Sequence, residues 1–483
     1  MHSNLRFETG ERKQSVLGIT PCHYRRSAIV RFGTVGVGPD RRLPAISRRS
    51  SGPCVALIDA LSQGSFPARR SARIQPPACG GSAARADFSA GLILFSLLIH
   101  LLISTIFPHE STGMKILKKA LLWLASLIGI LVLLVVVVGW SLSSRIPPEM
   151  IEYLESLAYY QDGAFFNEER QASYEFRWQA IEAQFFGEEQ REPPSPVPVV
   201  EIEPARFAAT PSQSLRVNWL GHSSTLVEFD GYRVLIDPVF SERASPFQFL
   251  GPRRFHPPPI ALANVKNVDV VVVSHNHYDH FDEVTIRHLA AQGAHIFVPL
   301  GVSERLKGWE IPAKQIHSLE WWQEVAVGDL RVVATPARHY SGRGLFDIKE
   351  THWASWSLIG PEHRVFYSGD SGYSKLFAQI GERLGPFDLT VIKVGSYGPD
   401  QGWLDIHMVP EDSVRVHRDV RGKRMLPVHW ATFNLAYHDW DEPIKRTLAV
   451  AASNGVQLVV PKLGATVDIS GEEMIDPWWE SVR

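Results

Sequence analysis

Hydrophobic and polar residues follow three different patterns along the 483-residue chain. Residues 1–88 have poor hydrophobic periodicity and are rich in Arg, Ser, Pro and Gly, so they bury too little apolar surface to offset the entropy of ordering. Residues 120–140 carry no charge and no proline. From about Leu215 onward, short apolar runs alternate with turn residues. These patterns predict a disordered leader, a membrane-spanning helix and a folded domain rich in strands.

The uncharged run of residues 120–140 has the length of a membrane span, which needs about 20 apolar residues. Lys115, Lys118 and Lys119 precede it and favour a cytoplasmic N-terminal side. A cleaved signal peptide and a buried core helix are the alternatives. We predict a single-pass transmembrane anchor over residues 116–142, typical of a bacterial inner membrane. The sequence does not determine on which side of the membrane the domain lies.

The basic leader, residues 1–113, contains all three cysteines and a single lysine, Lys13. It is either an Arg-rich extension or a segment upstream of a true start at Met114, and we favour the second interpretation because a Lys-rich stretch and an apolar run follow Met114. A metal site in the remaining chain must use His and carboxylates, since no cysteine is left there. The net charge of −2 argues against a nucleic acid as partner.

The rest of the chain is predicted to contain a helical and Pro-rich linker, residues 143–205, and a folded domain, residues 206–483. Strands are expected at 215–220, 225–229, 232–236, 268–273, 365–367, 389–394, 425–428 and 457–460, and helices at 282–291 and 410–420. The turn Asp230-Gly231 is a hairpin signal. Strands that alternate with helices indicate layered sheets covered by helices.

A metal-binding pattern follows directly on the apolar run 268–273. His275, His277, Asp279 and His280 place three imidazoles and one carboxylate within six residues. Zinc prefers these donors, and a loop that leaves a strand can turn them toward one point. An isolated His-x-His is often only a pair of surface histidines, but the full pattern behind an apolar strand favours a metal site.

Three further residues repeat this layout at other strand ends. His339 follows the run 332–334, Asp370 follows 365–367, and His429 ends another apolar run. Each of them alone could be an ordinary loop residue. Together they supply the donors that a second metal would need, because one loop cannot complete two coordination shells.

The order of these residues resembles that of the metallo-β-lactamase superfamily and, more narrowly, of the N-acylphosphatidylethanolamine-hydrolysing phospholipase D family. The similarity extends over about residues 206–468. Its motifs are Trp219–Ser224, Asp237–Phe240, Arg243–Pro246, Gly251–Phe255, Ser274–His280, Val298–Gly301, Trp321–Trp322, Gly369–Tyr373, Gly385–Asp388 and His429–Phe433. The resemblance implies an α/β fold, the αββα sandwich of the metallo-β-lactamases.

The resemblance also implies two zinc ions and their ligands. One ion would be bound by His275, His277 and His339, the other by Asp279, His280 and His429, with Asp370 bridging both. The implied activity is hydrolysis of a phospholipid such as N-acylphosphatidylethanolamine to phosphatidic acid and an N-acylethanolamine. A zinc-bound hydroxide would attack the phosphorus atom.

The resemblance assigns catalytic roles to Asp279, Asp370 and His407. His407 would donate to a phosphate oxygen or protonate the leaving group, and its alternative role is that of a helix-entry residue. Asp237 is expected to hydrogen-bond a ligand histidine or the metal loop, and His222 to act similarly.

Two positions depart from the mammalian members of the family. Ile406 stands where they have Gln, and Phe249, after the matching Gln248, stands where they have Tyr, which leaves the head-group specificity open. A lactonase or another small-molecule hydrolase of the same fold is an alternative, because fold and metals do not fix the substrate. A non-catalytic zinc protein is a further alternative, but a purely structural site would be closed by four ligands.

Overall fold

The computed structural model describes residues 112–169, 187–398, 401–471 and 475–483, and the predictions for residues 1–111 lie outside them. The chain divides into two units, residues 1–86 and 87–483, and all described residues belong to the second unit.

The predicted membrane span is helical. Helix α2, Thr112–Leu142, is 31 residues long, and the most apolar stretch within Ile116–Leu142 has a mean hydropathy of 3.1 and is not buried against the protein. At a rise of 1.5 Å per residue, 27 residues extend roughly 40 Å, enough to cross the apolar core of a bilayer. By length and composition, α2 could therefore be a membrane anchor.

Part of the segment predicted to be a linker packs onto the domain. It forms helix α3, Pro148–Glu155, and a small hairpin of β1, Tyr160–Gln161, and β2, Ala164–Phe165. Leu154, Tyr160 and Phe165 belong to the hydrophobic core. Apolar side chains in an otherwise polar stretch thus hold these residues on the domain.

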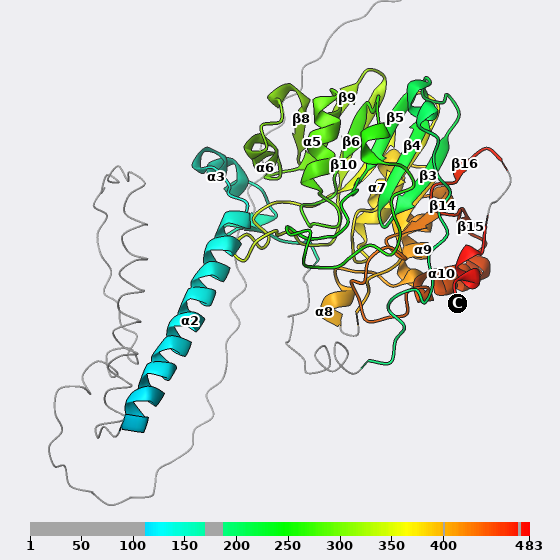
Figure 1. The fold of residues 1–483 in the computed structure, drawn as a ribbon. Coiled ribbons are helices and arrows are strands. Elements are labelled where there is room, and N and C mark those ends of the chain that lie inside the picture. Colours follow the sequence, from blue (N-terminus) through cyan, green and yellow to red (C-terminus); the bar gives the residue numbers. More distant parts are fainter. Residues whose placement is uncertain (1–111, 170–186, 399–400, 472–474) are drawn as a thin grey trace, which may run out of the picture. The chain divides into compact units, whose positions relative to one another are not determined.

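The domain is built from two seven-stranded sheets (Figure 1). The first sheet has the order β16 (Thr466–Asp468), β3 (Arg216–Gly221), β4 (Ser224–Phe229), β5 (Tyr232–Ile236), β6 (Val270–Val272), β7 (His295–Pro299) and β8 (Ile316–Leu319). The second has the order β15 (Gln457–Leu458), β14 (Gly422–Val428), β13 (Phe387–Lys393), β12 (Arg364–Tyr367), β11 (Ser355–Ile359), β10 (Leu330–Thr335) and β9 (Glu324–Val327).

Helices cover the outer faces of both sheets. They are α5 (Glu283–Ala291), α6 (Ser303–Gly308), α7 (Leu376–Leu384), α9 (Pro410–Asp419) and α10 (Glu442–Asn454), and the short α8 (Gln401–Leu404) precedes α9. Helix α6 contacts β8, whereas α9 contacts β13 and β14. This arrangement is the predicted αββα sandwich.

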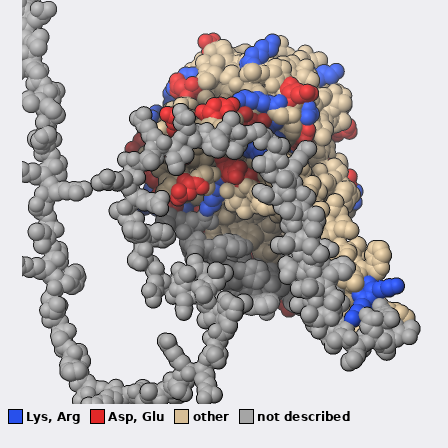
Figure 2. All heavy atoms as spheres, turned by 90° about the vertical axis from the view of Figure 1, so that its left-hand side faces the viewer, with Lys and Arg blue, Asp and Glu red and all other residues tan. Residues whose placement is uncertain are grey.

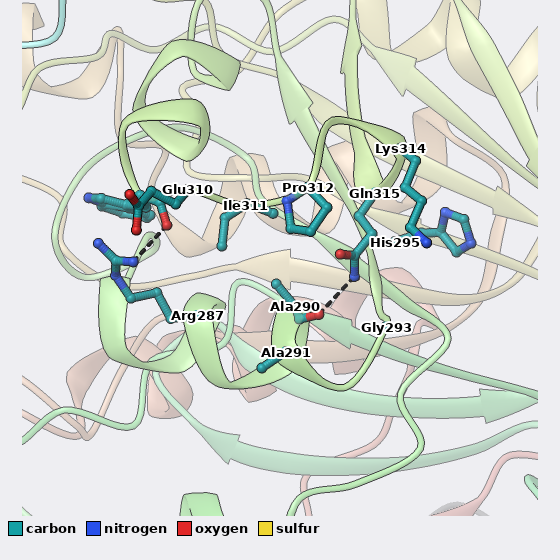
Figure 3. Close-up of a pocket in the computed structure, with 11 residues that line it drawn as sticks. Arg287, Ala290, Ala291, Gly293, His295, Glu310, Ile311, Pro312, Lys314 and Gln315 are labelled. Carbon is teal, nitrogen blue, oxygen red and sulfur yellow. Dashed lines mark hydrogen bonds between the residues drawn. The ribbon is translucent and has the colours of Figure 1, made fainter.

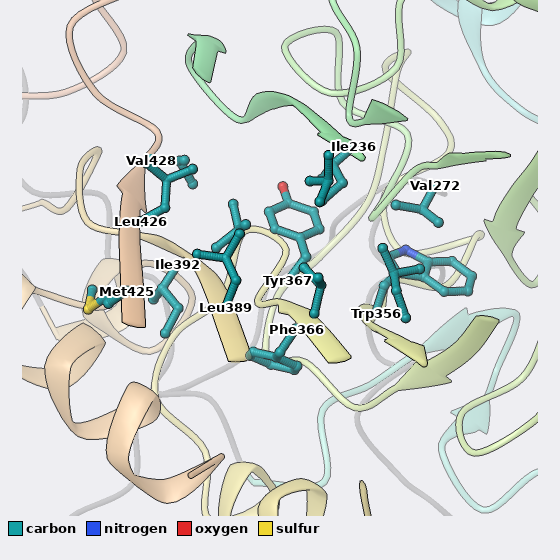
Figure 4. Packing of buried hydrophobic residues seen from close by; sticks show 14 of the residues in the cluster. Ile236, Val272, Trp356, Phe366, Tyr367, Leu389, Ile392, Met425, Leu426 and Val428 are labelled. Atoms are coloured by element: carbon teal, nitrogen blue, oxygen red, sulfur yellow. The ribbon is translucent and has the colours of Figure 1, made fainter. Parts of the chain in front are cut away.

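The alternation of side chains along the strands divides the core into two layers. Val270 and Val272 of β6 lie in the cluster shared by both sheets, whereas Val271 between them lies in the cluster that includes Ile286 and Leu289 of α5. Successive side chains of a strand point to opposite faces, so β6 is apolar on both. Figure 4 shows residues of the first cluster packed together, among them Ile236 and Val272 of the first sheet.

The direction of the strands determines at which edge of the sheets the site lies. Strands β5 to β8 run parallel to one another, and so do β12 to β15. The C-terminal ends of parallel strands meet at one edge, and the loops that leave this edge are where ligands bind in such folds. The predicted hairpin between β4 and β5 is confirmed, with positive φ at Asp230 (52°) and Gly231 (80°) as a type I′ turn requires.

Candidate metal centre

Loops at the C-terminal ends of β6, β10, β12 and β14 bring all the predicted metal ligands together. Among the groups of described side chains whose ligand atoms lie within 4.8 Å of one another, two contain most of the predicted ligands. The first group is His275, His277 and His339, and the second is His222, Asp279, His280 and His429. The four predicted ligands of the β6 loop are thus divided between two groups, two in each, and each group also contains at least one histidine from another loop.

In the first group, the ring nitrogens face one another. His275 Nε2 lies 2.7 Å from His277 Nδ1, and His339 Nε2 lies 3.4 Å from the same atom. A hydrogen bond between two imidazole nitrogens needs a proton on one of them. Three ring nitrogens turned to one point are therefore better suited to binding a cation with their lone pairs than to hydrogen-bonding one another.

Asp370 lies between the two groups. Its Oδ2 atom is 3.7 Å from His339 Nε2 in the first group and 3.3 Å from His429 Nε2 in the second. Its Oδ1 atom is buried and has no hydrogen bond of good geometry among the described residues, although His407 Nδ1 is 3.0 Å away. A buried carboxylate in this position fits a ligand shared by two cations.

Outer hydrogen bonds orient the histidines. His275 Nδ1 lies 2.9 Å from Ser274 Oγ, and His339 Nδ1 lies 3.1 Å from the carbonyl oxygen of Ile406. When one ring nitrogen is held in this way, the other presents its lone pair to the site. The backbone carbonyl of residue 406 therefore accepts this hydrogen bond from His339 whatever the side chain at position 406.

Asp237 connects the two groups from behind. Its carboxylate accepts hydrogen bonds from Ser274 N (2.7 Å), Ser274 Oγ (2.5 Å) and Tyr367 Oη (2.6 Å), and lies 2.6 Å from His280 Nδ1. It thus orients His280 directly and His275 through Ser274. The residue is fully buried and has a positive φ of 37°, which turns the chain sharply at the end of β5.

Burial and neighbouring charges give these side chains the protonation states that a bound cation requires. Burial lowers the pKa of His275 and His339 well below the ordinary value and lowers that of His277 to about 4, so these rings are neutral near pH 7. Burial opposes the charge on Asp279 and Asp370, but the imidazoles around them hold the pKa of both carboxyls well below their usual range. Neutral imidazoles and ionised carboxylates are the donors that zinc prefers.

Two residues near the centre have roles that the sequence did not indicate, and a third does more than expected. His222, expected to hydrogen-bond a ligand or the metal loop, has Nε2 2.8 Å from Asp279 Oδ2 and also belongs to the second group itself. Lys393 is fully buried, with Nζ 3.6 Å from Asp370 Oδ1, and burial lowers its pKa to about 8. Asn167 bonds both the N–H and the carbonyl of His339. A lysine that ends the apolar strand β13 was a visible signal, whereas Asn167 offered none.

The centre opens to solvent on one side. Asp279 and His407 keep 15% and 13% of their side chains exposed, whereas His280, His339 and His429 keep at most 1%. Asp279 and His407 therefore border the path by which a substrate reaches the cluster.

A separate pocket of about 620 Å³ between α5 and the segment before β8 contains none of these residues (Figure 3). Arg287 donates to the carbonyl of Trp309 (2.6 Å), and Gln315 donates to that of Ala290 (2.8 Å). Because these two groups are already used in holding the structure together, the metal cluster is the better candidate for the chemistry.

Comparisons with known proteins agree with this geometry. A family model described as a beta-lactamase superfamily domain matches residues 232–430. The N-acyl-phosphatidylethanolamine-hydrolyzing phospholipase D 1 of Caenorhabditis elegans is 36% identical over 249 residues, which cover 50% of this chain and 69% of the relative. An uncharacterized protein of Mycobacterium tuberculosis is 48% identical over 291 residues, which cover 59% of this chain and 77% of the relative.

The chain therefore belongs to the metallo-β-lactamase superfamily and is a metal-dependent hydrolase. Within the superfamily it resembles N-acylphosphatidylethanolamine-hydrolysing phospholipase D. A mitochondrial enzyme of that name from Saccharomyces cerevisiae is 31% identical over 258 residues, and the match covers 51% of this chain and 54% of the yeast protein.

Proposed function

We propose that this protein is a membrane-anchored, zinc-dependent phosphodiesterase that hydrolyses a phospholipid such as N-acylphosphatidylethanolamine. The observation that carries the proposal is the convergence of His and Asp side chains from four strand ends on two adjoining groups joined by Asp370. The 36% identity to a relative named for this activity supports the choice of substrate.

In this proposal, His275, His277 and His339 would hold one zinc ion. Asp279, His280 and His429 would hold the second, and Asp370 would be a ligand between the two groups. When bound, two zinc ions supply Lewis-acid chemistry at neutral pH and offset the negative charge of a phosphodiester. The residues of the chain fix these ligands through Asp237, Ser274 and the carbonyl of Ile406.

His407 is proposed to act on the substrate from the open side of the cluster. Its Nδ1 atom faces Asp370 Oδ1 at 3.0 Å, which leaves Nε2 to meet a phosphate oxygen or the leaving oxygen. The neighbouring Asp279 is held by His222 and keeps its orientation when a substrate enters. Lys393 supports Asp370 from within the protein, 3.6 Å from Oδ1.

The helix α2 is proposed to anchor the enzyme in the membrane that contains its substrate. The most apolar stretch of its segment Ile116–Leu142 is not buried against the protein, as expected for a surface that meets lipid. Anchoring would raise the local concentration of a phospholipid substrate around the cluster.

Two substrates distinguish this function from that of a lactonase. The full chain in mixed micelles would be given N-acylphosphatidylethanolamine or a short-chain lactone, and the products would be separated by mass spectrometry. We expect phosphatidic acid and an N-acylethanolamine to appear, and their formation to stop when a chelator removes the metal. Turnover of the lactone without turnover of the phospholipid would refute the substrate assignment.

Variants test the cluster. His275→Ala or Asp370→Asn should abolish zinc-dependent hydrolysis, because each removes a proposed ligand. His288→Ala is the matched control, since this histidine lies on α5 outside both groups, and its ring hydrogen-bonds the carbonyl of Val265 and the side chain of Gln292. Undiminished turnover in either ligand variant would overturn the proposal.

A further inference from the structure

Two loops of the domain expose large apolar side chains to solvent. Phe249 and Leu250 follow the Arg243–Pro246 motif, with 80% and 63% of their surface exposed. Leu345, Phe346 and Ile348, in the loop after His339, are more than half exposed. Single exposed apolar residues are ordinary, but clusters of them mark contact surfaces. We call these five residues the apolar tips.

The tips of the second loop lie against the end of α2. Leu345 packs so closely on Gly139 that a Cβ atom at this glycine would lie 2.5 Å from Leu345 Cδ1. A Cβ atom on Gly344 would lie 2.4 Å from the carbonyl oxygen of Gly139. The loop therefore touches the last turns of the helix through two residues without side chains.

Polar contacts hold the loop after His339 against the C-terminal end of α2. Asp347 is fully buried, and its carboxylate accepts hydrogen bonds from the N–H groups of Ser144 (2.6 Å), Arg343 (3.0 Å) and Gly344 (2.7 Å). Arg305 of α6 donates to the carbonyl of Leu142, the last residue of α2. The direction in which α2 leaves the domain is therefore set by hydrogen bonds, and the second loop must follow the helix toward the membrane.

The first loop belongs to the same face. A pocket of about 260 Å³ is lined at once by Leu142 of α2, by Pro246 and Gln248 of the first loop, and by Arg343 of the second. Phe249 and Leu250 directly follow Gln248 in the sequence. Both sets of apolar tips thus flank the end of α2.

The residues around the C-terminal end of α2 are of the types found at the interface between a bilayer and water. Arg145 lies over the ring of Trp140, 3.7 Å from its centroid, and Trp and Arg are typical of the boundary between lipid tails and water. The pocket between the loops is lined by four arginines and two carboxylates, namely Arg243, Arg287, Arg305, Arg343, Asp282 and Glu283. Figure 2 shows basic and acidic residues interspersed over the described surface that faces the viewer. An excess of arginines beside apolar tips suits anionic lipid head groups.

We propose that the apolar tips dock the domain onto the bilayer that α2 enters, so that the domain lies on the membrane by the face that carries its metal loops. The inference rests on the proposed anchoring by α2. It adds an orientation, because the loop that carries Leu345 and Phe346 begins just after His339, and Gly342 N donates to Asn276 Oδ1 (2.7 Å) in the β6 loop. Docking of the tips would hold both metal loops at the level of the lipid head groups.

Fluorescence quenching tests the depth of each position. Cys22, Cys54 and Cys79 are replaced by Ser in the full chain, and one new cysteine is labelled with an environment-sensitive fluorophore. The labelled variants are Leu131→Cys within α2, Phe249→Cys and Phe346→Cys at the tips, and Val200→Cys as the control. Val200 is 41% exposed and bonds Leu463, beside β16 at the sheet edge opposite β8. Each protein is placed in vesicles of phosphatidylcholine and phosphatidylglycerol with a quencher attached to lipid or dissolved in water.

We expect the lipid-borne quencher to reduce the emission at positions 131, 249 and 346, and only the aqueous quencher to act at position 200. Quenching from lipid at 131 but from water at 249 and 346 would overturn the docking and leave the anchor intact. Quenching from water at all four positions would overturn the anchor as well. Protection of 249 and 346 from both quenchers would mean that protein covers the tips, and would also overturn the proposal.

Discussion

The carboxylate of Asp237 gives the sharpest test of how the metal centre is built. Asp237→Asn keeps the size of the side chain but replaces one acceptor oxygen by a donor. Four donors now point at this carboxylate, from the N–H and the hydroxyl of Ser274, from Tyr367 and from His280. The amide oxygen accepts at most two hydrogen bonds, so at least two buried donors lose their acceptor.

The size of the effect follows from these contacts. Each unpaired buried donor costs about 1–3 kcal/mol of stability. Removal of such outer contacts lowers metal affinity by about 10- to 100-fold, because the ligand ring loses its orientation and basicity. Both zinc ions should be affected, since Asp237 holds His280 directly and His275 through Ser274. Ser274→Ala, which cuts only the path to His275, should weaken the first ion more than the second.

Zinc binding measured in buffers of fixed free zinc concentration would give both affinities, and thermal unfolding would confirm that the variants are folded. Asp230→Asn is the control, because Asp230 also pairs with a histidine, His363, at 2.5 Å, but lies at a hairpin turn between β4 and β5. A folded Asp237→Asn protein whose two zinc affinities stay within about threefold of the wild type would refute this reasoning.

Three further predictions concern turnover, acid stability and the anchor. His407→Gln should lower turnover of the phospholipid by about 10²- to 10⁴-fold with zinc content unchanged, as metal analysis beside kinetics would show. His352 is buried, neither of its ring nitrogens has a hydrogen bond among the described residues, and burial lowers its pKa well below the ordinary value. As the pH falls, the imidazole of His352 is protonated in the unfolded chain before it is protonated in the folded protein. The free energy of unfolding should therefore fall by about 1.4 kcal/mol for each pH unit below pH 6.5. In His352→Phe, the free energy of unfolding should fall less between pH 7.5 and pH 5. Gly344→Ala should cost about 1–3 kcal/mol, because its new methyl group meets the carbonyl of Gly139, and proteolysis after α2 should become faster.

The sequence predicted the metal-bearing part of the fold because local signals and strand order agree there. Each predicted ligand follows an apolar run, and all eight expected strands are present, from β3 to β15. Parallel strands bring their C-terminal ends to one edge, so a repeated layout of strand and ligand was enough to predict that His275, His339, Asp370 and His429 would meet. The run 332–334 before His339 lies in β10, whereas strands β7 to β9, β11 and β16, and helices α6, α7 and α10, were not predicted from the pattern.

Contacts between distant segments were beyond the reach of the pattern. Asn167 lies in the stretch predicted to be a linker, yet its amide bonds the backbone of His339, 172 residues away. Lys393 is paired with Asp370 only because β12 and β13 are neighbours in the sheet. Such residues carry no motif, since their types are common and only the register of strands and the path of the chain bring them to the centre.

The residue between the first two histidines shows how the anchor and the centre depend on each other. Asn276 is fully buried, and its side chain contacts Gly342 N in the loop after His339 and Ser144 Oγ just after α2, at 2.7 and 3.4 Å. Its backbone carbonyl accepts a hydrogen bond from Arg343 (2.9 Å). A side chain in the middle of the metal loop is thereby tied to the residues that fix α2. Because a movement of the end of α2 would be passed to the loop of His275 and His277 through the side chain of Asn276, the placement of α2 is tied to the geometry of the metal centre.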